Sequence, residues 1–327
     1  MIRLAPIPAG LPATVPFVGP ETLERQAGRP FAARLGANEN GFGPSPHAVA
    51  AMRDAAAEVW KYGDPTNHDL RAAIAAHCGV TPAHVVVGEG IDTLLGLAVR
   101  LMVAEGDRVV SSEGGYPTFD FHVTGFGGEL LRVPYRDDRQ DPQALVARAG
   151  ETGARMVYLC NPDNPMGGWH PPEVIEAAIA ALPDDILLIL DEAYAEFAPA
   201  LPRIDPDDPR VLRMRTFSKA HSMAGARIGW AIGAAIGVTV AQSSNGNFAK
   251  TLRGEKDLVD SVGATRTSAV GAPLAPKVDE FGPQVVVRAV QCHAGIALVR
   301  DDLVDHELPH AFTSCLELVG KREVDHG

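Results

Sequence analysis

Three side chains with acid–base or hydrogen-bonding chemistry each stand just beyond a short apolar run. Asn164 follows the run at 155–160, Asp191 follows the run at 185–190, and Lys219 follows the run at 210–216. A carboxylate at the rim of a buried strand is costly unless a partner stabilises its charge. For Asp191 that partner is a helix N-terminus, an arginine or the protonated ring nitrogen of a bound molecule. A lysine at such a strand end is a nucleophile when neighbouring positive charge lowers its pKa.

Donors for a phosphate group accompany these residues. The stretch GEGIDT (88–93) opens a predicted helix with two glycines, and free backbone N–H groups at a helix start suit an anion. Taken alone, GEGIDT is more simply a tight turn between a strand and a helix. The further donors are the hydroxyl groups of Thr216 and Ser218 and the guanidinium of Arg227, which can grip a phosphate with two nitrogens.

Two tyrosines and an asparagine complete the set. Tyr116 follows a glycine pair and is either a ring that stacks on a flat ligand or a half-buried packing residue. Tyr194, three residues after Asp191, can lie at the same strand end as Asp191. Asn164 lies in NPDNPMGG (161–168), a rigid turn with two Asn-Pro pairs, so its amide serves either a ligand or the scaffold. An acid for a ring nitrogen, an aromatic ring, phosphate donors and an amine together match pyridoxal phosphate (PLP).

The elements that must position these residues alternate between strand and helix from about residue 45 to 233. Such alternation predicts an α/β domain with a mainly parallel sheet covered on both faces, where ligands gather at the carboxyl ends of the strands. Ser45 is the predicted N-cap of the first helix, and Gly79 is predicted to stop the second. The predicted helices cover 46–60, 68–78, 93–103, 142–149 and 171–182, and the predicted strands cover 84–88, 107–112, 129–133, 155–160, 185–190, 210–216 and 226–232.

Composition narrows the class of protein. The 327 residues are 46% hydrophobic and carry a net charge of −12, which argues against a polyanion such as nucleic acid as the main partner. No apolar run is long enough to span a membrane. Four scattered cysteines fit a reducing cytoplasm and no zinc site. Five prolines interrupt the apolar N-terminus, so we expect residues 1–30 to be an extended arm rather than a signal peptide.

Several motifs over residues 30 to 233 resemble one family. The chain is similar to the PLP-dependent aminotransferases of fold type I (class I/II), and most of all to their histidinol-phosphate aminotransferase branch. The resemblance implies a large PLP-binding domain at 31–234, with a mainly parallel sheet flanked by helices. The motifs are ANENGFGPSP (37–46), KYGDPTNHDLR (61–71), GEGID (88–92), YPTF (116–119), NPDNPMGG (161–168), DEAYAEF (191–197) and RTFSKAHSMAGARIGWAIG (215–233).

The resemblance also implies a role for each matching residue. Lys219 would form the internal aldimine, a Schiff base with the cofactor, and then act as general acid and base. Asp191 would pair with the pyridine nitrogen, Tyr116 would stack on the ring, and Tyr194 and Asn164 would bind its phenolic oxygen. Tyr62 would reach the phosphate of a neighbouring subunit in a homodimer, and Asn40 would lie near the substrate. The phosphate group would be held by Gly90, Ile91, Asp92, Thr216, Ser218 and Arg227.

The chain departs from the family pattern in places. NENG, GEGIDT and SKAHSMAGAR replace the common NENP, GxGSDE and SKAFGLAGLR, and we expect His221 to be a packing residue. Residues 235–327 match no family motif, so we expect a small, atypical C-terminal domain that is divergent or incomplete. A substrate-anchoring arginine is expected there, and the candidates are Arg253, Arg266, Arg288, Arg300 and Arg322.

Three functions remain open at this point. The first is an aminotransferase that moves an amino group from histidinol phosphate or an amino acid to a 2-oxo acid. The second is a PLP-dependent decarboxylase of a phosphorylated amino acid, and the third is a catalytically inactive PLP-fold remnant. A nucleotide-binding dehydrogenase is disfavoured, because GEGIDT lacks the GxGxxG spacing.

Overall fold

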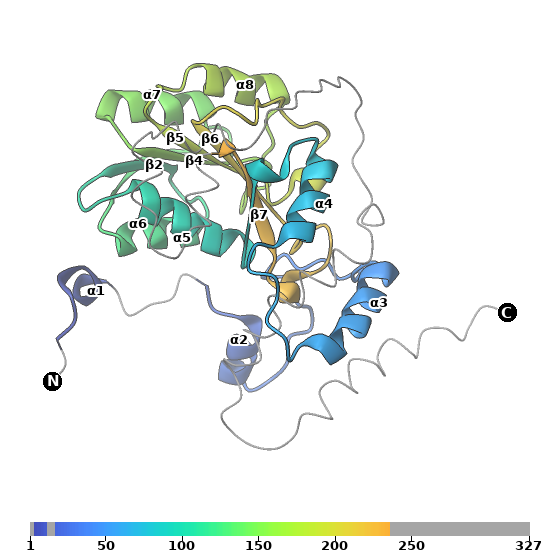
Figure 1. The fold of residues 1–327 in the computed structure, drawn as a ribbon. Helices are drawn as coiled ribbons and strands as arrows, with labels where there is room; N and C mark the ends of the chain where they lie inside the picture. The colour runs from blue at the N-terminus through green and yellow to red at the C-terminus, as the bar shows by residue number, and fades with distance from the viewer. Residues whose placement is uncertain (1–2, 12–16, 236–327) are drawn as a thin grey trace.

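A computed structural model describes residues 3–11 and 17–235, and its centre is one seven-stranded sheet with the order β1-β7-β6-β5-β4-β2-β3 (Figure 1). Strands β2 to β6 run parallel to one another, whereas β7 is antiparallel to both β1 and β6. The predicted mainly parallel sheet is therefore confirmed. The strands are β1 (Val85–Gly88), β2 (Arg108–Ser112), β3 (Glu129–Val133), β4 (Met156–Cys160), β5 (Leu187–Asp191), β6 (Val211–Thr216) and β7 (Gly229–Ile232).

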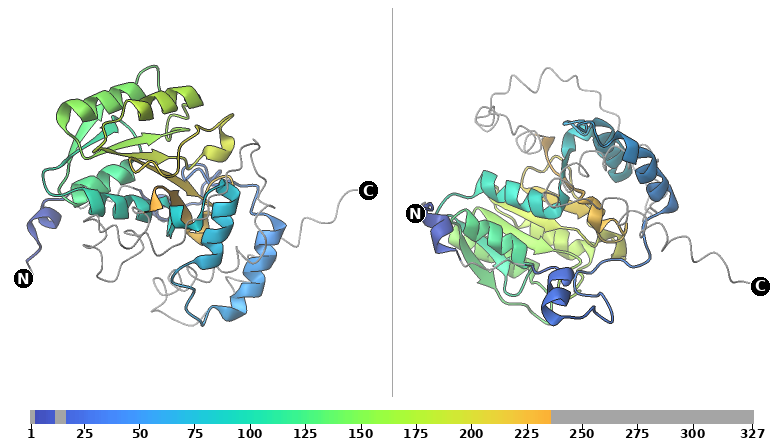
Figure 2. Two further views of the ribbon diagram at one scale, coloured as in Figure 1. Left: turned by 45° about the horizontal axis from the view of Figure 1, so that its top comes forward. Right: turned by 90° about the horizontal axis from the view of Figure 1, so that it is seen from below.

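Helices cover both faces of this sheet (Figures 1 and 2). Within residues 3–11 and 17–235, short 3-10 helices supplement them, namely η1 (Ala56–Glu58), η2 (Pro82–His84), η3 (Ala195–Phe197) and η4 (Ala224–Ala226). The α-helices in the described part of the chain are α1 (Pro6–Gly10), α2 (Pro20–Ala27), α3 (Pro46–Ala55), α4 (His68–Cys78), α5 (Gly90–Met102), α6 (Pro117–Gly125), α7 (Pro142–Thr152) and α8 (Pro172–Ala180).

Local sequence explains where these helices begin and end. Proline occupies the first turn of α3 and α7, where its missing N–H costs nothing. Asp141 caps α7 by accepting the N–H of Ala144 at 3.0 Å. Gly79 and Gly153 end α4 and α7 in the left-handed conformation, with φ of 68° and 61°, which glycine adopts without strain.

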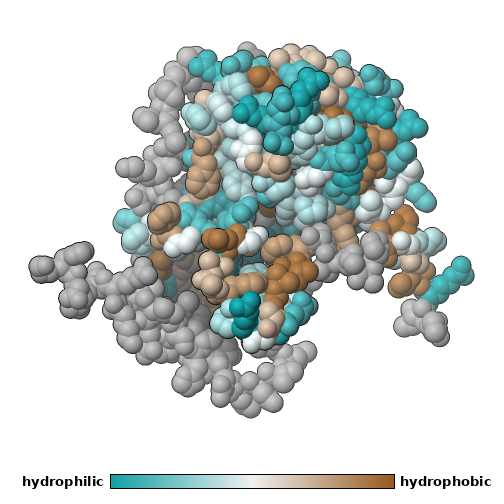
Figure 3. All heavy atoms as spheres, turned by 180° about the vertical axis from the view of Figure 1, so that it is seen from behind, coloured by the Kyte–Doolittle hydropathy of each residue, from teal (hydrophilic) through white to brown (hydrophobic). Residues whose placement is uncertain are grey.

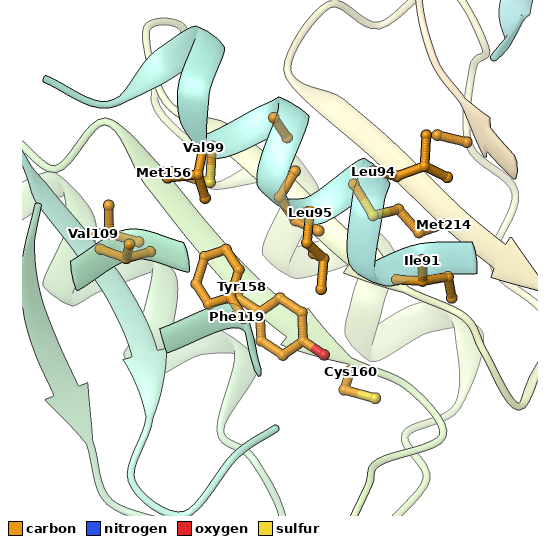
Figure 4. Close-up of a cluster of buried hydrophobic side chains, with 14 of the residues drawn as sticks. Ile91, Leu94, Leu95, Val99, Val109, Phe119, Met156, Tyr158, Cys160 and Met214 are labelled. Carbon is orange, nitrogen blue, oxygen red and sulfur yellow. The ribbon is translucent and has the colours of Figure 1, made fainter. Parts of the chain in front are cut away.

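The alternation of side chains along each strand divides the core into clusters on the two faces. Figure 4 shows the cluster beneath α5 and α6, where Ile91 and Leu95 from α5 and Phe119 from α6 meet Met156 and Tyr158 of β4. The alternate residues of β4, Val157 and Leu159, join a second cluster with α7 and α8. A third cluster packs α3 and α4 against β1 and β7. Residues that are neighbours in one strand therefore face different helices.

The structure corrects three details of the predicted elements. The N-terminal arm is not wholly extended, because Pro20 starts α2 and Gly28 ends it in the left-handed conformation. The first long helix ends at Ala55 and continues only as the 3-10 helix η1, short of residue 60. The sequence also gave no signal for α6, which begins at Pro117 directly after Tyr116.

Some sequence predictions concern residues beyond this description. The C-terminal segment was predicted at 235–327, and its first residue belongs to the described part of the chain. The rest of the segment, with the five candidate arginines, lies outside the described residues. Within residues 3–11 and 17–235, no helix is long and apolar enough to cross a membrane. The same residues contain no cluster of His, Cys, Asp and Glu that could hold a metal ion.

Candidate active site

The predicted site residues follow strands that end at one edge of the sheet. Strands β4, β5 and β6 are parallel, so Cys160, Asp191 and Thr216 lie at their shared carboxyl edge. Strand β1 points the same way, because β7 is antiparallel to both β1 and β6, and it delivers the start of α5 to this edge. The loops after these strands bring Asn164, Lys219 and the residues around Gly90 to this edge. We call the place where these residues and Asp191 lie the mouth of the site.

Asp191 is a buried carboxylate with no cationic partner among the described residues. It is 4% exposed, and its Oδ2 accepts a hydrogen bond from the Tyr158 hydroxyl at 2.7 Å while its Oδ1 accepts the N–H of Ala193 at 2.9 Å. Burial raises the pKa of Asp191 to about 6, although both hydrogen bonds act in the opposite direction. The arginine or helix N-terminus considered as its partner is replaced by a tyrosine and one backbone N–H.

Lys219 lies at the same mouth with its amine held by backbone. Its Nζ donates to the carbonyl oxygen of Ala37 at 2.9 Å and lies 5.6 Å from the centre of the Tyr194 ring. The pKa of Lys219 is lowered, as predicted, but burial is the main cause. Arg227 makes only a small contribution, and the carboxylates of Asp191 and Glu39 oppose the shift.

Asn38 joins the two residues predicted to bind a phenolic oxygen. Its side-chain amide donates to the hydroxyl oxygen of Tyr194 at 3.0 Å and, at the longer distance of 3.5 Å, to Oδ1 of Asn164. Accepting this bond leaves the Tyr194 O–H and the Asn164 side-chain N–H groups free to act as donors. Tyr194 and Asn164 are therefore brought together, although they lie on different loops.

The start of α5 and the loop before β7 meet closely at the other side of the mouth. Gly90 has a φ of 79°, and a Cβ atom there would lie 2.5 Å from Nη2 of Arg227. A Cβ atom at Gly229 would lie 2.6 Å from the carbonyl carbon of Gly90. Arg227 donates to the backbone carbonyls of Ala224 and Glu89, at 3.1 and 3.3 Å. Among the described residues this guanidinium has no carboxylate partner, which suits it to an anionic ligand.

The two hydroxyl groups of the Lys219 loop form a local hydrogen-bond network. Thr216 Oγ1 lies 2.9 Å from Ser218 Oγ, accepts the N–H of Ser218 at 3.0 Å, and lies 3.1 Å from the carbonyl oxygen of Ile228. Both side chains are buried. Thr216 therefore shapes the loop that carries Lys219, and its predicted contact with a phosphate stays a prediction.

The remaining predicted residues differ in whether they contact the site. Tyr116 is half-buried, and its hydroxyl donates to Asp92 at 3.2 Å, while burial raises its pKa to about 12. Asn40 donates to the carbonyl oxygen of Ala220, next to Lys219, at 3.1 Å. Tyr62 is fully exposed and touches none of these groups. His221 is 3% exposed and packs edge-on against Phe217, in line with its predicted packing role.

A buried ion cluster lies behind the site on the opposite face of β5 and β6. Glu192 is 1% exposed, and its two carboxylate oxygens accept hydrogen bonds from Arg213 at 2.9 and 3.0 Å and from Arg215 at 2.9 Å. Burial alone would raise the pKa of Glu192, but the charges and hydrogen bonds of the two arginines together lower it. We call these three residues the arginine brace.

Sequence reasoning overlooked Tyr158, Asn38 and the arginine brace. A tyrosine inside the otherwise apolar strand MVYLC was the available signal for Tyr158, because a buried hydroxyl needs a partner. The alternation of Arg213, Met214 and Arg215 was the signal for the brace, since it puts both arginines on one face. Asn38 offered no signal beyond its place in the ANENGFGPSP motif.

Comparisons with known proteins agree with this geometry. A family model described as aminotransferase class I and II matches residues 33–268. The histidinol-phosphate aminotransferase of Anaeromyxobacter sp. (strain Fw109-5) is 35% identical over 237 residues, which are 71% of this chain and 65% of that protein. The crystal structure of histidinol-phosphate aminotransferase from Sinorhizobium meliloti in complex with pyridoxal-5'-phosphate is 45% identical, with a TM-score of 0.71, and the match covers 92% of this chain and 73% of that chain.

The matches do not extend over the full length of the relatives. The chain covers 65% of the Anaeromyxobacter protein and 56% of the histidinol-phosphate aminotransferase of Moorella thermoacetica, to which it is 31% identical. It thus spans less than two thirds of these relatives. The aspartate aminotransferase of Thermus thermophilus, at 24% identity and a TM-score of 0.64, shares the fold.

Proposed function

This chain belongs to the class I and II aminotransferases, and we propose that it is a PLP-dependent transaminase that moves an amino group from an amino donor to a 2-oxo acid. The observation that carries the proposal is Asp191, a buried carboxylate without a cation, at the same mouth as the half-buried amine of Lys219. A charge placed in this way is expected to receive a cation from a ligand.

The residues present fit this cofactor. Asp191 would face the ring nitrogen, and the free donors of Tyr194 and Asn164 would bind the phenolic oxygen. Gly90 has a φ of 79°, which favours glycine, and its missing side chain leaves room beside Arg227, so backbone N–H groups and the guanidinium can approach a phosphate. When bound, PLP supplies an electron sink for the carbon next to the amino group.

Lys219 supplies the proton chemistry. Its amine is the group that would anchor the cofactor and then carry a proton as general base and general acid. Burial lowers its pKa, so a larger fraction of the amine is unprotonated near neutral pH than in an exposed lysine. The carbonyl oxygen of Ala37 holds Nζ at the mouth.

Histidinol phosphate is the amino donor that we propose first, because the curated relatives with 31–35% identity carry that name. We propose that Asn40 lies near the substrate, and its hydrogen bond to the carbonyl oxygen of Ala220, beside Lys219, supports this role. An amino acid donor is the second choice. A cytoplasmic location is proposed as well, because Cys78 and Cys160 are free thiols in the described part of the chain.

We also propose that the active form is a homodimer in which Tyr62 enters the partner's site. The Tyr62 side chain is fully exposed, and the neighbouring Trp60 is 77% exposed. Figure 3 shows that hydrophobic surface gathers on the lower part of the rear face, where Figure 1 places α1 and α2. Such surface is typical of an interface with another protein. The most exposed large apolar residues are Leu4, Phe17, Leu35, Phe42, Trp60, Tyr62 and Phe197.

The first experiment measures transamination by the purified full-length chain. With histidinol phosphate, 2-oxoglutarate and added PLP, we expect glutamate to form, and Lys219→Ala to reduce turnover by about 10⁴-fold or more. Lys61→Ala is the matched control, since Lys61 is a half-exposed lysine paired with Glu58. Borohydride reduction of the wild-type protein should fix the cofactor to the peptide that contains Lys219.

The same samples separate the alternative functions. Histidinol phosphate has no carboxyl group to lose, so a phosphorylated amino acid is supplied in its place, and release of carbon dioxide without a keto product would favour a decarboxylase. Retention of PLP without reaction with any amino donor would identify an inactive PLP-fold protein. Failure to retain PLP at all would overturn the proposal.

Subunit mixing tests the dimer. Lys219→Ala and Tyr62→Ala each damage one component of every site in their own homodimers. A mixed dimer contains one site that carries both changes and one site that carries neither. Mixing the two inactive variants should therefore restore measurable activity, and no recovery in dimers shown to exchange subunits would contradict a shared site.

A further inference from the structure

Tyr158 contributes a single polar atom to an apolar strand, and that atom meets Asp191. All five residues of β4 are buried, and Tyr158 is fully so. The neighbouring strand β5 lies in register, with Cys160 opposite Asp191. The Tyr158 hydroxyl therefore reaches along the strand end to Oδ2 of Asp191, at 2.7 Å. A distance this short is typical of a hydroxyl that donates to a carboxylate.

The Tyr158 ring has no freedom to turn away from this contact. It stacks on the ring of Phe119 with centres 4.5 Å apart and planes inclined by 18°. Figure 4 shows the two rings against each other within the buried cluster, with the Tyr158 oxygen directed to the side of Cys160. The direction of the O–H group is therefore fixed by packing before any ligand binds.

The second oxygen of Asp191 is held in a different way. The N–H of Ala193 donates to Oδ1 at 2.9 Å, so each oxygen has one donor and each keeps the capacity to accept another hydrogen bond. Burial, and then the charge of Asp191, raise the pKa of Tyr158, so its hydroxyl stays protonated and remains a donor.

We propose that Tyr158 is a positioning residue that holds the Asp191 carboxylate ionised and directed at the strand-end mouth. Tyr158 would affect the reaction by way of Asp191, so its role in the reaction rests on the proposed PLP chemistry. Phenylalanine would fill the same stack on Phe119, so the hydroxyl is not needed for packing. Its loss would leave a buried carboxylate oxygen without its donor, which favours the neutral acid.

A second tyrosine provides a matched control. Tyr135 donates to Oδ2 of Asp163 at 2.9 Å, and Asp163 is also buried and accepts a bond from Gln140 at 2.7 Å. Tyr135→Phe therefore removes the same kind of hydrogen bond from a different buried carboxylate.

The ionisation of Asp191 depends on groups from several elements. Asp92 on α5 and the adjacent Glu192 disfavour its charge. Lys219 lies close enough for mutual electrostatic influence. The other titratable groups that interact with Asp191 are Tyr116 at the start of α6, Cys160 on β4 and Tyr194 after β5.

The experiment measures the ionisation of Asp191 directly in the cofactor-free full-length protein. Carbon-13 NMR of labelled aspartate carboxyl groups gives the midpoint pH, and Asp191→Asn assigns the signal. We expect Tyr158→Phe to raise the Asp191 midpoint by about one pH unit, and Tyr135→Phe to leave it unchanged. Replacing Tyr158 with 3-fluorotyrosine, a stronger donor of nearly the same volume, should lower the midpoint.

Cofactor binding supplies a second readout. Added PLP should bind Tyr158→Phe more weakly, by up to about tenfold below pH 6 and by about twofold at pH 7, because the difference shrinks as the pH rises and Asp191 ionises. An unchanged Asp191 midpoint in both Tyr158 variants, or an equal shift in Tyr135→Phe, would overturn the positioning role. A midpoint shift in Tyr158→Phe supports the positioning role whether or not PLP binds. Failure of PLP to bind wild type and variants alike would overturn the proposed function and leave the positioning role standing.

Discussion

Asp191 and Glu192 are adjacent, buried carboxylates that point to opposite faces of β5 and have opposite electrostatic surroundings. Glu192 lies between Arg213 and Arg215, whose combined effect lowers its pKa. Among the residues that the structure describes, Asp191 has two neutral donors, and burial raises its pKa to about 6. Glu192 therefore stabilises the fold by its ion pairs, whereas Asp191 lacks a cationic partner among the described residues and lowers the stability of the fold.

The largest expected effect comes from breaking the arginine brace. Glu192→Gln leaves the buried guanidinium of Arg215 and the partly buried one of Arg213 without their counter-charge, and we expect the free energy of unfolding to fall by about 3–5 kcal/mol at pH 7. Urea denaturation of the cofactor-free protein measures this. Glu151→Gln is the control, because Glu151 is 67% exposed and lies 3.9 Å from Arg148, and it should change stability by less than about 0.5 kcal/mol.

The dependence on pH sharpens this prediction. A lowered folded-state pKa means that the stabilisation by Glu192 is present above its ordinary value of 4.5 and is lost as the pH falls through the lower folded-state value. The difference between wild type and Glu192→Gln should therefore shrink in acid. A constant difference from pH 7 to pH 3 would contradict the ion-pair explanation.

Asp191→Asn should act in the opposite direction on the cofactor-free protein. The folded state holds a proton on Asp191 more tightly than the unfolded state, so its contribution to stability decreases as the pH rises from about 4 to about 6. At pH 7 we expect the variant to be more stable than wild type by about 1–3 kcal/mol. The gain should vanish below pH 4, and PLP binding should be strongly weakened.

Thermal and urea unfolding across that pH range check the Asp191 prediction. Asp184→Asn is the control, since Asp184 is fully exposed near Arg210. A variant less stable than wild type at pH 7 would show that Asp191 has a stabilising partner, and the contrast with Glu192 would fail.

Lys219→Met should show the smallest of these changes in stability. Burial lowers the pKa of Lys219, so the folded state disfavours its charge and loses stability as the pH falls below the ordinary value of 10.5. We expect a gain of about 0.5–2 kcal/mol at pH 7 in the cofactor-free protein, together with loss of turnover. Lys61→Met, at a half-exposed lysine, should leave stability and turnover unchanged. An equal gain in stability in Lys61→Met would show that burial of Lys219 is not the cause.

The sequence predicted where the site residues lie in the fold better than it predicted which side chains they contact. The strand ends that carry Asp191 and Lys219 follow from apolar runs and turn residues, which are local signals. The contact from Tyr158 to Asp191 depends on the register of β4 against β5, 33 residues apart, and no local pattern fixes it. The 3-10 ending of α3 and the helix α2 were obscured because alanines extend an apparent helix and prolines suggest an extended arm.

The alternation at positions 191 and 192 also has a consequence for how the chain folds. A slip of β5 by one residue against β6 would turn Asp191 toward the two arginines and Glu192 into the mouth. The shorter aspartate reaches the guanidinium groups less well, and the longer glutamate would crowd the Tyr158 hydroxyl. Misaligned chains are thus penalised by the mismatch in side-chain length, so the arginine brace favours the native alignment of β5 with β6 before any small molecule is present.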